Sequence, residues 1–219
     1  MGPPFKIGIK LAWVLGLFPG ALSAQSFWDQ FSYDRLRFTG IGVEIGPTWS
    51  DRVTTELSGS LRVDWGLIAP NVRLLFSGKY FSAQVNQSEI AKLETQLRNV
   101  IDDPTGVAMI NIGDIEWRNL GVVSEVQYIL PATRQLMFYG GVGLGVDFRN
   151  GSGPAIENTI VEDAFDTIVA TGVLSVGSEF ALTGEWFVTA GLTGMISSEL
   201  RTLALRGGVM YRPPLGGTR

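Results

Sequence analysis

The feature of this sequence that most restricts its fold is a regular alternation of apolar and polar residues. In the stretch TELSGSLRVDWGL, Leu61, Val63 and Trp65 share one parity, and Arg62 and Asp64 share the other. Successive side chains of a β-strand point to opposite faces, whereas a helix with 3.6 residues per turn would mix the two sets. The alternation therefore predicts a strand with one apolar and one polar face.

The same pattern recurs along the chain and predicts eight strands. Their expected ranges are 36–48, 53–68, 71–84, 115–130, 135–148, 167–182, 185–197 and 201–212. The links 69–71, 131–134 and 183–185 are short enough for tight turns. In an up-and-down meander both long links, from the third to the fourth strand and from the fifth to the sixth, lie at one end. We call this the long-loop end and the opposite one the short-turn end.

The stretch YGGVGLGVDF (139–148) allows a second interpretation, a glycine-rich phosphate loop. Such a loop needs a strand, then the glycines, then a helix whose N-terminus faces the phosphates. Here the glycines lie inside the alternation, and the segment RNGSGP that follows is not a helix start. We therefore predict alternate glycines on the polar face of a strand, as suits a crowded barrel interior.

Composition excludes several classes of function. The net charge of −4 and the lack of a Lys/Arg cluster argue against nucleic-acid binding. The chain has no Cys and no His, which removes disulfides, thiolate chemistry and catalysis by imidazole. We therefore expect no cofactor, no metal and no enzymatic activity.

The N-terminus has the pattern of a secretory signal peptide. Lys6 and Lys10 are followed by an apolar run and then by the small residues Ala21, Ser23 and Ala24. The run is too short to cross a hydrocarbon core, which needs about 20 residues. We expect a signal peptide over 1–24 and a periplasmic segment over 25–35, with a buried N-terminal helix as the alternative.

Two kinds of barrel accommodate eight such strands. In a soluble lipocalin-like carrier the apolar parity points inward, whereas in a membrane barrel it faces lipid. The polar parity is rich in Gly, Ser and Thr and sparsely charged, which favours the membrane. Strands of about 12 residues are long enough for a tilted crossing. Because lipid offers no hydrogen-bonding partner, the first strand is expected to pair with the eighth.

Aromatic residues also favour the membrane, because they gather at the expected strand ends. Two interfacial girdles are typical of membrane barrels. At the short-turn end the predicted girdle comprises Trp65, Tyr128, Phe138, Phe180, Trp186 and Tyr211, and at the long-loop end it comprises Tyr80, Trp117 and Phe148.

On this pattern, residues 1–212 resemble the small outer-membrane β-barrel family, the eight-stranded barrels of Gram-negative bacteria. The resemblance implies an all-β, eight-stranded antiparallel up-and-down transmembrane barrel over 36–212. It also implies a location in the outer membrane, with lipid and the barrel-assembly machinery as partners. Members include membrane anchors, adhesins, narrow channels and a few lipid-modifying enzymes. Such barrels often stop at an aromatic residue, whereas Tyr211 is followed by RPPLGGTR, whose last part (213–219) we expect to form a tail.

The membrane orientation places a set of charged residues in the lumen. An eight-stranded interior is just wide enough to be filled by side chains. We expect a plug of salt bridges, with a polar path for a small solute or a proton as the alternative. The expected residues are Glu44, Glu56, Arg62, Asp64, Arg73, Lys79, Glu125, Asp147, Glu179 and Arg206.

Both long links have patterns of their own. Segment 86–103 predicts a short helix with Ser88 as N-cap and an apolar stripe that includes Ile90 and Leu93. The helix is expected on the barrel rim, or as a lid or a binding helix. Segment 150–166 is acidic but matches no calcium loop. The sequence thus predicts a non-catalytic outer-membrane barrel with a structural, adhesive or narrow-pore role, and a soluble periplasmic carrier of an apolar ligand is the alternative.

Overall fold

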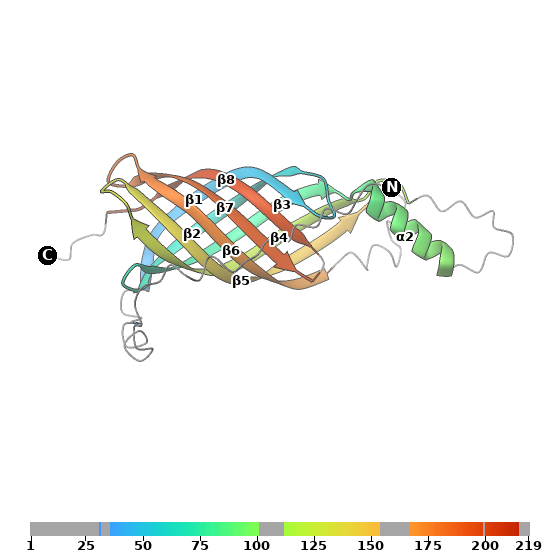
Figure 1. Ribbon diagram of the computed structural model, residues 1–219, viewed down its shortest axis with the longest axis horizontal. Coiled ribbons are helices and arrows are strands. Elements are labelled where there is room, and N and C mark those ends of the chain that lie inside the picture. Colours follow the sequence, from blue (N-terminus) through green and yellow to red (C-terminus); the bar gives the residue numbers. More distant parts are fainter. Residues whose placement is uncertain (1–30, 32–35, 101–111, 154–166, 199, 215–219) are drawn as a thin grey trace, which may run out of the picture.

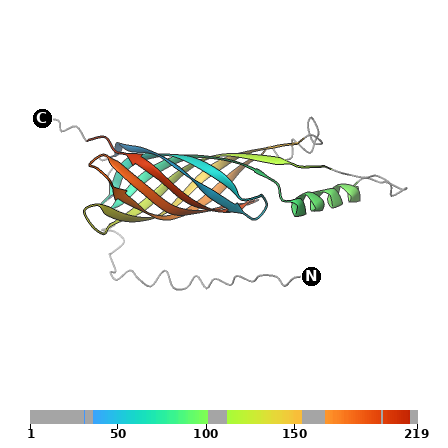
Figure 2. The same cartoon turned by 90° about the horizontal axis from the view of Figure 1, so that it is seen from above.

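The computed structural model describes residue 31 and residues 36–100, 112–153, 167–198 and 200–214. Eight antiparallel strands form a closed barrel in the order of the sequence (Figures 1 and 2). The elements are β1 (Leu36–Ser50), β2 (Glu56–Ala69), β3 (Val72–Gln84), α2 (Gln87–Val100), β4 (Glu116–Pro131), β5 (Leu136–Ser152), β6 (Thr167–Ala181), β7 (Trp186–Ser197) and β8 (Arg201–Tyr211).

The barrel closes where β1 pairs with β8, in a register that includes Ile41 opposite Tyr211 and Ser50 opposite Thr202. The predicted eight-stranded antiparallel up-and-down barrel is therefore confirmed. The largest boundary difference is at β5, which continues to Ser152 and pairs there with Glu116 at the start of β4. Because of this extension, Arg149 lies within β5.

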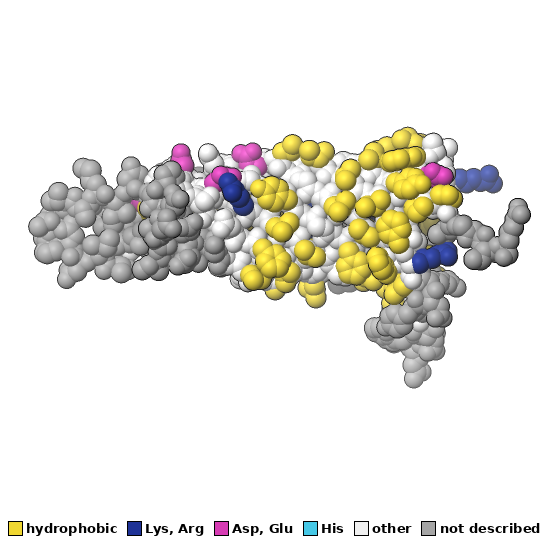
Figure 3. All heavy atoms as spheres, turned by 180° about the vertical axis from the view of Figure 1, so that it is seen from behind, with side chains coloured by type: hydrophobic (Ala, Val, Ile, Leu, Met, Phe, Trp, Pro, Cys, Tyr) yellow, Lys and Arg dark blue, Asp and Glu magenta, His cyan; other side chains and the backbone are white. Residues whose placement is uncertain are grey.

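The apolar parity of the strands faces outward. Leu144 exposes 76% of its surface and Val43 exposes 55%, whereas the inward Arg73 exposes 1%. Figure 3 shows hydrophobic side chains spread over the outer wall, with charged side chains near its two ends. The lipocalin-like alternative requires the opposite orientation, with apolar side chains inside, and the structure contradicts it.

Eight of the nine predicted girdle residues lie on the outer wall, of which Tyr211 is half-buried and the others are exposed. Trp186 packs against Tyr211, with 5.1 Å between the ring centroids. Tyr80 in β3 and Phe148 in β5 lie on either side of Leu120 in β4, so both are at the same level of the long-loop end. Phe38 and Trp49 are also exposed on the outer wall.

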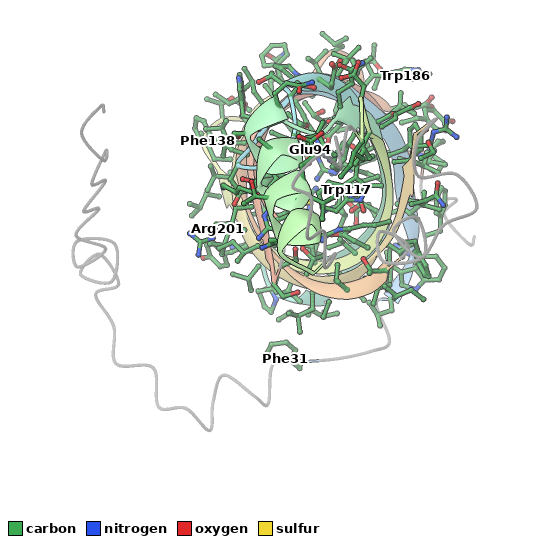
Figure 4. The ribbon with its side chains drawn as sticks, turned by 90° about the vertical axis from the view of Figure 1, so that its right-hand side faces the viewer. Phe31, Glu94, Trp117, Phe138, Trp186 and Arg201 are labelled. Atoms are coloured by element: carbon green, nitrogen blue, oxygen red, sulfur yellow. The ribbon has the colours of Figure 1, made fainter. Side chains whose placement is uncertain are left out.

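Trp117 was wrongly predicted to belong to the girdle. It is 6% exposed and lies inside the ring of strands, whereas Phe138 and Trp186 project outside it (Figure 4). Its parity in β4 is that of the buried Asn119 and opposite to that of the exposed Leu120. The alternation alone therefore indicates that Trp117 points inward. The girdle prediction was wrong because it relied on the aromatic character of the residue.

The helix predicted in the first long link is present as α2, beyond the long-loop end of the barrel (Figures 1 and 2). It begins at Gln87, and the N–H of Ile90 donates to the carbonyl of Asn86. Ser88 therefore lies in the first turn and is not the N-cap. Ile90 and Leu93 pack against the residues that close this end, as expected for a helix on the rim.

The glycines of YGGVGLGVDF lie within β5, so the strand interpretation is confirmed. A Cβ atom on Gly143 would lie 2.6 Å from the carbonyl oxygen of Ser124, and one on Gly145 would lie 2.3 Å from that of Val122. Both distances are far below van der Waals contact, so β4 and β5 approach closely only because these inward positions lack side chains.

Several predictions fall outside the described residues. These are the signal peptide (1–24), nearly all of the N-terminal segment (25–35), the acidic part of the second long link (154–166) and most of the tail. No helix in the described ranges is long and apolar enough to cross a membrane.

Candidate functional site

The chemically distinctive part of the molecule is its lumen, where the inward parity gathers charged side chains. Arg62 and Asp64 stand two residues apart on β2 and therefore project from the same face. Eight of the ten predicted lumen residues are buried inside the barrel: Arg62, Asp64, Arg73, Lys79, Glu125, Asp147, Glu179 and Arg206. Glu44 also points inward, with 9% of its side chain exposed.

Glu56 does not join this group. It has the inward parity of Ser58 but is exposed, because it is the first residue of β2 and lies at the rim. Its carboxylate accepts a hydrogen bond of 3.4 Å from the hydroxyl of Thr54. The structure thus corrects the prediction that Glu56 belongs to the lumen.

Six residues form a continuous set of ion pairs in the short-turn half of the lumen, which we call the charged network: Glu44, Arg62, Asp64, Arg73, Glu179 and Arg212. Its centre is the carboxylate of Glu179, which is fully buried. Glu179 is paired with Arg73, and its second oxygen accepts a bond of 2.7 Å from Arg212.

A second carboxylate, that of Asp64, binds the same two arginines. Its Oδ2 lies 3.4 Å from Arg73 and 3.2 Å from Arg212. Two acids and two arginines thus bind one another reciprocally, which balances their charges where water is scarce. Arg62 extends the network by pairing with Glu44 and lies 4.0 Å from Glu179.

Tyr139 and Gln127 hold the arginines of the network in place. The guanidinium carbons of Arg62 and Arg73 each lie 5.3 Å from the centroid of the Tyr139 ring, within the range of cation–π attraction. The side-chain oxygen of Gln127 accepts a bond of 2.8 Å from Arg73, while its amide nitrogen donates to Glu125. Glu125 also accepts a bond from Ser175.

The long-loop end of the lumen is closed by a different kind of packing. We call this cluster the apolar plug, and its buried residues are Val53, Phe81, Ala83, Val85, Ile90, Ile112, Ile115, Trp117 and Leu200. β3 and β4 supply Phe81, Ala83 and Trp117, while the other six residues come from α2 and the links. Just below it, Asp147 pairs with Arg149 at 3.7 Å, and the Arg149 guanidinium lies 5.4 Å from the Trp117 ring centroid.

The sequence analysis missed four lumen residues: Gln127, Tyr139, Arg149 and Arg212. Each has the inward parity of its strand. Gln127 and Tyr139 were already on the predicted polar faces, but only charged residues were selected there. Arg149 was not selected because the fifth strand was expected to end at residue 148. Arg212 follows β8 directly, and it was counted with the terminal segment although it continues the parity of the inward Arg206.

The acidic side chains of the lumen are candidates for metal ligands and for free carboxylates. Among the described residues there is no group of three His, Cys, Asp or Glu side chains that could hold a metal ion. The buried carboxylates of Glu179 and Asp64 are occupied by arginines.

The fold and lumen define a class: a small eight-stranded barrel with apolar residues outside and charged residues inside. The structure is similar to that of Neisserial surface protein A, with a TM-score of 0.53 at 9% identity over 79% of this chain and 96% of that chain. The fold-level resemblance to small outer-membrane barrels is thereby confirmed. At this identity, the likeness shows a shared fold only.

Two further structures are similar at 11% identity and a TM-score of 0.45. They are Ail, the attachment invasion locus protein of Yersinia pestis, and the N-terminal β-barrel domain of OprF from Pseudomonas aeruginosa. The alignments cover 80% of this chain and 99% and 97% of the respective chains. No protein-family model matches the chain, and the comparison with curated proteins gave no match.

Proposed function

We propose that this protein is an integral outer-membrane barrel whose filled lumen makes it a rigid anchor for its long-loop end. The observation that carries the proposal is the distribution of polarity across the barrel wall. The outward residues Arg118 and Arg201 lie near the long-loop end, and Arg37 lies near the short-turn end. In the band of the wall between these two levels, no outward strand residue in the described ranges is charged. A wall of this composition suits lipid, because hydrocarbon strongly disfavours charge.

The strand lengths support the same proposal. The strands have between 11 and 17 residues, and a tilted transmembrane strand needs about 9–11. The exposed aromatic residues on either side of the aliphatic band, such as Trp186 and Tyr80, suit the two membrane interfaces. Outer-membrane lipid and the barrel-assembly machinery are the partners that this location requires.

A narrow-pore role is less well supported than an anchoring role. A pore needs a continuous wet path, whereas here the charged network fills the short-turn half and the apolar plug closes the long-loop end. What such a barrel can present outside the membrane is α2 and the extension of β4 and β5 beyond the rim. We therefore favour a non-catalytic structural or adhesive role for the segments at the long-loop end.

The location is tested by expressing the full chain and fractionating the membranes. An integral barrel is extracted only with detergent, and it migrates faster on gels when it has not been boiled. Recovery of a monomer in osmotic-shock fluid without detergent would contradict the proposal. Spin labels at Leu61 and Leu144 sharpen the test, since both are expected to be accessible to oxygen dissolved in lipid, whereas a label at Val123 is not.

The closed lumen is tested by conductance of the refolded protein in planar bilayers. We expect no discrete steps for the natural sequence. Removing a network residue with Arg62→Ala should leave the bilayer silent as well, because the apolar plug remains. Regular steps from the natural protein would instead support the pore. An assay of lipid turnover, expected to be negative, tests the absence of catalysis.

A further inference from the structure

Two cations in the middle of the lumen lack the partners that the other buried cations have. Lys79 is 4% exposed and Arg206 is 6% exposed, yet neither forms a salt bridge with a described residue. The Nε atom of Arg206 is buried without a hydrogen-bond partner. The ammonium group of Lys79 contacts the sulfur of Met195, which is a weak acceptor.

The balance of charges in the lumen explains why Lys79 and Arg206 remain without a salt bridge. Among the residues that the structure describes, the inward cations are Arg62, Arg73, Lys79, Arg149, Arg206 and Arg212, and the inward carboxylates are Glu44, Asp64, Glu125, Asp147 and Glu179. Within this set six cations face five acids, so one positive charge has no counter-charge.

Lys79 and Arg206 line the same small cavity, whose volume is about 20 Å³. A cavity of about 10–15 Å³ or more, measured in this way, has room for one water-sized particle. Its other charged lining groups are Arg62, Glu44 and Glu125. Because Arg62 is paired with Glu44, what is left at the cavity is two cations against one carboxylate.

We propose that this cavity binds one small monovalent anion, chloride in the cell, between the Lys79 ammonium and the Arg206 guanidinium. A buried charge without a counter-charge is strongly unfavourable, and two like charges that share a site repel each other. One monovalent anion cancels the excess charge and accepts hydrogen bonds from both cations. Chloride is a single atom and suits this small space, whereas phosphate or an organic carboxylate exceeds it. The site does not depend on the proposed membrane role.

The halide dependence of stability tests the site. The full chain is refolded in detergent micelles and unfolded with urea in sodium chloride, bromide or gluconate at equal ionic strength. Above the dissociation constant, the unfolding equilibrium constant should fall about tenfold for each tenfold rise in halide. Gluconate is too large and should have no such effect. Equal stability in halide and gluconate would overturn the proposal and leave a water molecule as the occupant.

Variants assign the effect to the two cations. Arg206→Met and Lys79→Met should each abolish the halide dependence, while Arg134→Met, in the exposed turn between β4 and β5, should retain it. If Arg206→Met does not fold, Arg206→Lys keeps the charge and should retain the dependence with weaker binding. Halide dependence that persists unchanged in Arg206→Met would place the ion elsewhere.

Bromide locates the ion directly. Crystals grown in sodium bromide should show an anomalous peak between the side chains of Lys79 and Arg206 and no peak in the apolar plug. A folded barrel whose lumen shows no such peak would contradict the anion site, yet it would leave the proposed membrane role untouched.

Discussion

The two ends of the lumen are both filled with buried side chains, yet these side chains are charged at one end and apolar at the other. The short-turn half is packed with ions, and every member of the charged network except Arg212 comes from a strand. The long-loop end is packed with aliphatic and aromatic side chains, several of which come from α2 and the links. A barrel can therefore fill its interior either with ion pairs between charged side chains or with packed apolar side chains. The two solutions should respond differently to substitution.

The largest effect is expected at the centre of the charged network. Glu179→Ala leaves Arg73 and Arg212 with only Asp64 as a nearby counter-charge. Breaking a buried ion pair by removing one partner costs about 3–5 kcal/mol. Urea unfolding in micelles measures the loss, and Glu56→Ala at the exposed rim is the control that should change little. A loss below about 1 kcal/mol would mean that the network is not tightly coupled.

The apolar plug should be weakened by a cavity rather than by a stranded charge. Ile115 is fully buried there, so Ile115→Ala is expected to cost about 3 kcal/mol, within the usual range for such truncations. Ile196→Ala on the exposed outer wall is the control, because it leaves no cavity. If the two variants lose the same stability, the plug is not packed as a core.

The inner and outer faces of β5 should differ in their tolerance of one methyl group. Gly145→Ala would collide with the Val122 carbonyl at 2.3 Å, and overpacking costs about 1–3 kcal/mol. Gly140→Ala is matched to it, since its Cβ would meet nothing closer than the Ser175 carbonyl at 3.9 Å. That variant should be neutral or stabilising by about 0.5–1 kcal/mol, because alanine fits a strand better than glycine. The thermal unfolding midpoints of the two variants measure this difference in stability. Equal midpoints would contradict the close approach of β4 and β5.

The smallest effect separates the two roles of Tyr139 in the charged network. Tyr139→Phe removes the hydroxyl, which accepts a bond of 3.4 Å from Arg62, but keeps the ring beside both arginines. The loss should be about 0.5–1.5 kcal/mol, the value of one ordinary hydrogen bond. Tyr139→Leu, which also removes the ring, should lose more. If the two variants unfold at the same urea concentration, the ring makes no contribution of its own.

Sequence reasoning was strongest where a local rule acts on every residue. The alternation predicted all eight strands and placed Arg62, Asp64, Arg73 and Glu179 inside, and the lack of hydrogen-bonding partners in lipid predicted closure. It was weaker at strand ends, where Glu56 was placed inside and Arg149 was missed. Trp117 shows the same limit, because its residue type was given more weight than its parity.

The pairing of side chains across the lumen could not be predicted. Arg73 and Glu179 are 106 residues apart and meet only because the barrel brings β3 and β6 face to face. Partner choice depends on register and on the shear of the closed sheet, which no single strand encodes. The same holds for the apolar plug, whose members come from β3, β4, α2 and the links.

What the sequence determined by itself is the side of the wall on which each strand residue lies, because period 2 is a property of the extended backbone. What the tertiary structure decided is which inward charges meet, and which two, Lys79 and Arg206, form no salt bridge with a described residue. Closure of the sheet fixes those distances, and electrostatic energies depend on distances across the barrel rather than on positions along the chain.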